Sequence, residues 1–174
     1  MQHPLEFIPP AFRKPLLYGF LLLTLFIFGV FRLLDAPLQT DAAPNGIVSF
    51  ELAWTAETAK SILTSWDAEA RLFAAFGLGL DYLFMPAYAL ALSLGLLLSM
   101  KNKADWYSKF AAWMGWGAFA AALFDALENY ALWKELTGNM FSPYPEIAAT
   151  CASVKFALLL AGLLVVVAGK FVKA

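Results

Sequence analysis

The sequence predicts an all-α membrane protein, with four transmembrane helices in a bundle and a short amphipathic helix in the first outer loop. Of its 174 residues, 61% are hydrophobic and only 14% are charged. A soluble domain is about 45–50% apolar and about 25% charged. The apolar residues also gather in four stretches, each near the length of about 20 residues that crosses a bilayer core. One such stretch is compatible with a buried soluble helix, but four in so short a chain indicate a membrane protein.

The four spans are expected at about residues 15–34, 70–100, 105–136 and 145–170, within a single domain covering 1–174. The first span has the basic residues Arg13 and Lys14 before it, as a cleaved signal peptide would. Its apolar run is long, however, and the following "FRLLDAPLQ" offers no small-x-small cleavage site. We therefore interpret this span as a retained helix.

The distribution of lysine and arginine predicts the orientation, because cytoplasmic loops are enriched in these residues. They gather in the N-terminal tail, in the loop "KNKADWYSK" between the second and third spans, and in the C-terminal tail. The opposite side holds the acidic segment 35–69 and the connection 134–146. We therefore expect an integral protein of the cell (inner) membrane with both termini in the cytoplasm.

The first outer connection, about residues 35–68, begins with turn residues and continues with helical periodicity. Its apolar residues recur at steps of three and four and form one helical face, which contains Leu52, Ala56, Ala59, Leu63 and Trp66. Glu57, Ser61 and Ser65 fall on the opposite face. This pattern predicts a helix lying on the outer membrane surface or over the bundle, and we favour a surface anchor over a lid. Further along, Gly138 is expected to end the third helix, with Pro145 near the start of the fourth.

The third span carries polar residues, in the stretch "FDALENYAL" (residues 124–132), on the same side as its small residues. That stripe, spaced by three and four, contains Ala111, Gly115, Ala118, Ala122, Asp125 and Asn129. Small residues on a membrane helix mark close contact with another helix. Asp125 and Asn129 are therefore expected to face other helices rather than lipid, with Glu128 on the flank of the stripe.

The other spans place ionisable residues at a similar height. At about 1.5 Å per helical residue, Asp81 and Asp125 lie about 28 Å from the inner ends of their helices. The corresponding height is about 22 Å for Lys155 and about 25 Å for Arg32. Because all four spans contribute, we predict an outer-leaflet polar pocket. Its predicted ligand-binding residues are Arg32, Asp81, Tyr88, Asp125, Glu128, Asn129 and Lys155.

Buried charges in membrane helices are costly and commonly serve function, which favours binding or transport of a small polar or cationic ligand or ion. A purely structural ion-pair network is an alternative. A second alternative is a membrane enzyme acting on a lipid or isoprenoid headgroup with its paired carboxylates. Ser142 and Cys151 are candidate nucleophiles only by residue type. A third alternative is an assembly or interaction subunit of a membrane complex.

The oxygen ligands of Asp125, Glu128 and Asn129 would suit calcium, magnesium or manganese. Lys155 in the same zone would repel a cation, so no dedicated metal site is predicted. The only histidine, His3, is expected in the N-terminal tail, and no cofactor is identified. The net charge of −1 gives no reason to expect nucleic acid. The expected partners are the lipid bilayer, a small polar ligand or lipid, and either another membrane protein or a second copy of the chain.

Overall fold

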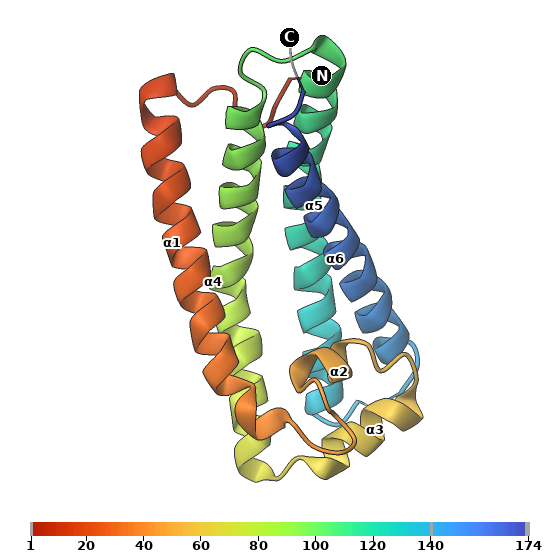
Figure 1. The fold of residues 1–174 in the computed structure, drawn as a ribbon. Coiled ribbons are helices and arrows are strands. Elements are labelled where there is room, and N and C mark those ends of the chain that lie inside the picture. Colours follow the sequence, from red (N-terminus) through yellow and green to blue (C-terminus); the bar gives the residue numbers. More distant parts are fainter. Residues whose placement is uncertain (1, 140, 173–174) are drawn as a thin grey trace. The chain divides into compact units, whose positions relative to one another are not determined.

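A computed structural model describes residues 2–139 and 141–172. Within these residues the regular structure is entirely helical, and four long helices form a helical bundle (Figure 1). They are α1 (Pro10–Leu34), α4 (Ala68–Ser99), α5 (Asp105–Leu136) and α6 (Tyr144–Ala168). Each is long and apolar enough to cross a membrane, which confirms the predicted fold class and places the four spans within a few residues of their expected bounds.

Three short helices connect α1 to α4 (Figure 1): η1 (Ala36–Leu38), α2 (Ile47–Glu51) and α3 (Ala56–Ser65). The sequence predicted one helix through this region, but the chain breaks between α2 and α3. Trp54 has φ 59°, a left-handed conformation in which a helix cannot continue. Thr55 then starts α3 as its N-cap, since its side-chain oxygen accepts a hydrogen bond from the Thr58 N–H at 3.2 Å.

The described residues separate into two compact units. Unit 1 comprises those within Met1–Leu25, Met85–Leu123 and Lys155–Ala174. Unit 2 comprises those within Phe26–Phe84 and Phe124–Val154. Each unit contains part of all four long helices, and unit 2 also contains the short helices. Because neither unit is a continuous piece of chain, the prediction of a single domain stays a prediction.

Tyr107 connects three helices in the interior of unit 1. Its side chain is only 2% exposed, and its hydroxyl donates to the Val165 carbonyl oxygen at 2.8 Å. The same hydroxyl lies 2.8 Å from the Ser99 Oγ. A Cβ at Gly169 would overlap the Tyr107 hydroxyl, so the absence of a side chain there permits this close approach. The neighbour of Tyr107 in sequence, Trp106, is by contrast exposed.

The N-terminal segment packs into unit 1 instead of extending as a free tail. His3 is 3% exposed, and its Nδ1 accepts a hydrogen bond from the Leu5 N–H at 3.1 Å. The imidazole ring packs directly against Gly115 of α5. A Cβ added at Gly115 would overlap the Nε2 atom of His3. The Trp116 Nε1–H donates to the Gln2 carbonyl oxygen at 3.2 Å. His3 lies in the N-terminal tail, as predicted, and this tail is packed against α5.

Acidification is expected to weaken unit 1 through His3. Burial lowers the pKa of His3 from 6.5 to about 4. The positive charge of Arg13 lowers this pKa further, whereas the negative charge of Glu6 and a hydrogen bond with the Ser93 backbone partly raise it. Below pH 6.5 the unfolded chain binds a proton that the folded chain does not, so stability falls as the pH drops from 6.5 toward 4. Thermal unfolding in detergent between pH 7 and 4.5 should show a smaller loss for His3→Gln than for the wild type. Parallel pH profiles for the two proteins would contradict this assignment.

The connecting segment supplies much of the apolar core of unit 2. Phe50 and Trp66 are 1% and 2% exposed, and their rings meet edge to face with centroids 5.3 Å apart. Trp66 Nε1–H also donates to the Leu38 carbonyl oxygen at 2.8 Å. The same cluster includes buried residues from the long helices, among them Ala70, Ala74, Ala131, Leu132 and Ala148.

The apolar face of the predicted surface helix is therefore covered mainly by protein. Ala59, Leu63 and Trp66 pack into the cluster, whereas Leu52 is left exposed beyond the helix break. The favoured interpretation of this face as a membrane-surface anchor is wrong for its buried residues. The face is apolar because it closes one end of the core of unit 2.

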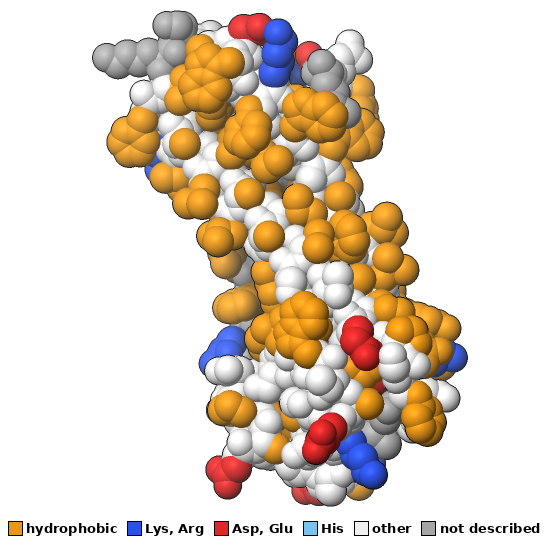
Figure 2. Space-filling view, turned by 90° about the vertical axis from the view of Figure 1, so that its right-hand side faces the viewer, with side chains coloured by type: hydrophobic (Ala, Val, Ile, Leu, Met, Phe, Trp, Pro, Cys, Tyr) orange, Lys and Arg blue, Asp and Glu red, His pale blue; other side chains and the backbone are white. Residues whose placement is uncertain are grey.

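The surface of the long helices is strongly apolar. In α1 only Ile27 is buried. Large hydrophobic side chains are exposed along the whole helix, including Phe12, Leu16, Leu22, Phe26 and Leu33. Figure 2 shows hydrophobic side chains over much of one face, with isolated acidic and basic side chains among them. Lipid contact explains this exposure, because soluble proteins rarely expose apolar surface so extensively.

Candidate functional site

The polar stretch of α5 lies on the buried face of the helix in unit 2. Asp125, Glu128 and Asn129 are 2%, 0% and 2% exposed. Residues three and four apart on a helix share a face, so burial of one predicts burial of the others. The expectation that Asp125 and Asn129 turn away from lipid is confirmed. Glu128, expected on the flank of the stripe, is buried as completely as they are.

Asn129 joins α5 to α4 within unit 2. Its Nδ2 donates to the Asp81 Oδ2 at 2.9 Å and to the Leu78 carbonyl oxygen at 3.2 Å. Both N–H groups of the amide are therefore used, which fixes the orientation of the side chain and leaves its carbonyl oxygen as an acceptor. The structure thus brings together Asp81 and Asn129, two of the predicted site residues. Asp81 is half-buried.

The buried acids of this stretch have a defined chemistry. A carboxylate removed from water is costly unless a cation, a proton or hydrogen-bond donors compensate its charge. Asp125 and Glu128, one helical turn apart, can direct two carboxyl groups toward one ligand. The positive charge that compensates such a pair can be replaced by that of a bound cation, which is the elementary step of cation binding.

Three further residues were predicted for the site. Tyr88 and Lys155 belong to unit 1, where they are 6% and 5% exposed, and Lys155 Nζ lies 4.7 Å from the centre of the Phe156 ring. Arg32 belongs to unit 2, but its side chain is 65% exposed and its Nη1 lies 3.9 Å from the Asp35 Oδ2. Ligand binding by these three residues stays a prediction.

The sequence reasoning missed a further buried acid, Glu135. It is 1% exposed, and neither of its carboxyl oxygens has a hydrogen-bond partner among residues 2–139 and 141–172. Steps of three and four lead along α5 from Asp125 through Glu128 and Leu132 to Glu135. Continuing the polar stripe by one more turn would have found it.

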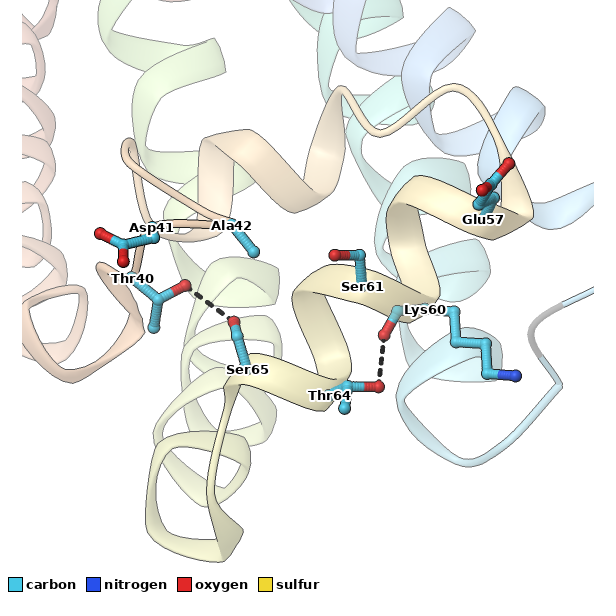
Figure 3. A pocket seen from close by; sticks show the side chains of 8 residues that line it. All are labelled: Thr40, Asp41, Ala42, Glu57, Lys60, Ser61, Thr64 and Ser65. Atoms are coloured by element: carbon cyan, nitrogen blue, oxygen red, sulfur yellow. Dashed lines mark hydrogen bonds between the residues drawn. The ribbon is translucent and has the colours of Figure 1, made fainter.

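Helix α3 and the loop residues 40–42 form a shallow polar groove in unit 2, with a volume of about 620 Å³ (Figure 3). Its lining residues are Thr40, Asp41, Ala42, Glu57, Lys60, Ser61, Thr64 and Ser65. The Thr40 and Ser65 hydroxyls lie 2.7 Å apart, and the Thr64 hydroxyl donates to the Lys60 carbonyl oxygen at 2.7 Å. The groove is thus built on the polar face that the sequence assigned to Glu57, Ser61 and Ser65. The hydroxyls of Thr40, Thr64 and Ser65 already bond to protein groups, and the charged side chains of the groove are exposed.

Within the described ranges, no three histidine, cysteine, aspartate or glutamate side chains come together in a way that could hold a metal ion. No protein-family model matches the chain, and comparisons with curated proteins and with solved structures give no match either.

Proposed function

We propose that this integral membrane protein binds or transports a small polar or cationic ligand or ion at the buried acids of α5. The observation that carries the proposal is the complete burial of Asp125 and Glu128 beside the hydrogen-bonded Asp81–Asn129 pair. Acids in membrane helices are costly and are commonly retained for function. A pair of helices fixed by Asn129 gives these acids a rigid setting, which lowers the entropy lost on binding.

The distribution of basic residues supports an orientation in the cell (inner) membrane with both termini in the cytoplasm. In that orientation the α5 acids lie in the outer leaflet, and a ligand reaches them from the outer side. A cationic or zwitterionic molecule, or an inorganic cation, suits two carboxyl groups and an amide oxygen. Arg32, Tyr88 and Lys155 are retained in this proposal as predicted ligand-binding residues.

The proposal predicts that cations stabilise the purified protein through Asp125. A ligand at 100 times its dissociation constant stabilises the folded state by about 2.7 kcal/mol. Thermal unfolding in detergent would be measured with sodium, potassium, calcium, magnesium, methylammonium and choline chlorides at constant ionic strength. At least one should raise the melting temperature of the wild type, and Asp125→Asn should remove that increase.

Glu57→Gln provides the matched control, because it removes an exposed carboxylate of unit 2 and should retain the response. Loss of the response in both variants would identify a general charge effect and count against a site on α5. A wild type that responds to no cation in the panel would favour the structural ion-pair network instead.

A further inference from the structure

Glu135 lies in an apolar setting near the end of α5. Its neighbours on the helix, Leu132 and Leu136, both contact the apolar cluster of unit 2. That cluster also contains Phe50 of α2, Ile62 of α3 and Ala148 of α6. Glu135 therefore lies where α5 meets the short helices and α6. A carboxyl group at such a position requires an explanation, because a well-packed apolar side chain would fit it without a desolvation cost.

The accessibility of Glu135 limits what can compensate its charge. Less than 1 Å² of each carboxyl oxygen is accessible to water, and neither oxygen receives a hydrogen bond from the residues that the structure describes. A cavity large enough for a water molecule beside these oxygens would make them accessible. No ammonium group or water molecule therefore fits against them in this conformation. A proton needs no cavity.

The charged groups around Glu135 do not favour the ionised form of its carboxyl group. From α6, the negative charge of Glu146 acts on Glu135. From α2, Glu51 has one buried carboxyl oxygen. On α5 itself, Lys134 directs its Nζ over the rings of Tyr130 and Trp133, 5.3 and 5.2 Å from their centres. The other charged side chains on α3 and α4 within unit 2 are Glu57, Lys60, Glu69 and Arg71, which are exposed, and the acid Asp81, which is half-buried.

We propose that Glu135 is a proton-binding site, distinct from the acids at Asp125 and Glu128, and that the folded protein holds it as a neutral carboxylic acid. The reaction is the addition of one proton to the carboxylate, with no change in oxidation state. Release of the proton leaves a negative charge buried in the apolar core. Because this charge has to be solvated, proton release requires water to enter between α5 and the short helices. Proton occupancy at Glu135 is thereby linked to the packing of α2 and α3.

Infrared spectroscopy of the purified protein in detergent tests the proposal directly. At pH 7 the wild type should show a carbonyl stretching band of a protonated carboxylic acid that is missing from Glu135→Gln. Glutamine has the shape of the protonated acid and cannot ionise, so the variant should fold. Glu146→Gln is the matched control, and at pH 7 it should still show the band. As the pH is raised, the band should disappear at a lower pH in Glu146→Gln than in the wild type.

Thermal unfolding provides a second measurement with a different readout. The unfolded chain loses the proton of Glu135 above a pKa of about 4.3, so the wild type should lose stability relative to Glu135→Gln as the pH rises above that value. The folding equilibrium constant should change by up to about tenfold per pH unit. Glu135→Leu, which replaces the neutral acid by an apolar side chain, should lack this component of the pH dependence as well.

Three results would overturn the proposal. The first is an identical carbonyl region in the wild type and Glu135→Gln, and the second is a pH dependence that both share. The third is stabilisation of the wild type by sodium or methylammonium chloride at fixed pH that Glu135→Gln lacks, which would assign the site to a larger cation. Asp125 and Glu128 are intact in every variant, so failure here is separate from failure of the function proposed for those residues.

Discussion

Trp66→Ala is expected to lower the free energy of unfolding of unit 2 by about 3–5 kcal/mol, the range for removal of a buried aromatic side chain. The substitution empties a site in the apolar cluster, removes the edge-to-face contact with Phe50, and leaves the Leu38 carbonyl oxygen without its indole donor. Because α2 and α3 are short, their structure depends on this packing more than on intrinsic helix propensity. Both helices should therefore loosen.

Hydrogen exchange in detergent measures this effect locally, since the amides of α2 and α3 should exchange faster while those of unit 1 retain their protection. Trp54→Ala is the matched control, because Trp54 belongs to the same segment but is 50% exposed. An exposed substitution of this kind usually changes stability by less than about 0.5 kcal/mol. Equal effects of the two variants would show that Trp66 does not organise the segment.

Gly115→Ala is the second substitution expected to have a large effect. The added Cβ would overlap the imidazole of His3, so the ring has to leave its place against α5. Overpacking of this kind typically costs about 1–3 kcal/mol. The N-terminal segment is then expected to separate from unit 1, and exchange of the Leu5 amide, which donates to His3 Nδ1, should accelerate.

Gly117→Ala on the same helix provides the comparison. Its Cβ would lie 3.7 Å from Leu158, an ordinary contact, so no neighbour has to move. Alanine is the better helix former by about 1 kcal/mol, and this variant should be as stable as the wild type or more so. If Gly115→Ala behaved like Gly117→Ala, the close approach of His3 to α5 would be refuted.

The long helices were predictable because each combines a long apolar run with clear end signals. Gly138, expected to stop the third helix, adopts φ +104° two residues after α5 ends at Leu136. The break between α2 and α3 was not predictable from periodicity, since the apolar pattern continues through it. The backbone conformation at Trp54 overrides that pattern. The burial of His3 also left no periodic signal, because the first nine residues precede α1.

The site was predictable in the parts that follow from helical spacing. Asp125 and Asn129 continue a stripe of small residues, and that alone indicated their burial. The contact of Asn129 with Asp81 joins two helices, and spacing within one helix cannot give such a pairing. Glu135 was overlooked because it lies near a helix end, where an acid is ordinarily solvated. Its neighbours Leu132 and Leu136 belong to or pack against the apolar cluster that the short helices complete, and spacing along α5 does not predict that packing.

The near absence of buried residues in α1 has a consequence for the forces that hold this helix. At 25 residues it is about 37 Å long, against about 30 Å of bilayer hydrocarbon, and only Ile27 is buried. Acyl chains rather than side chains of the protein therefore solvate most of its circumference. We therefore expect the tilt of α1 to follow the bilayer thickness, because hydrophobic mismatch is relieved by tilting. Helix α4 has far more of its residues buried, so we expect contacts with protein to fix its tilt instead.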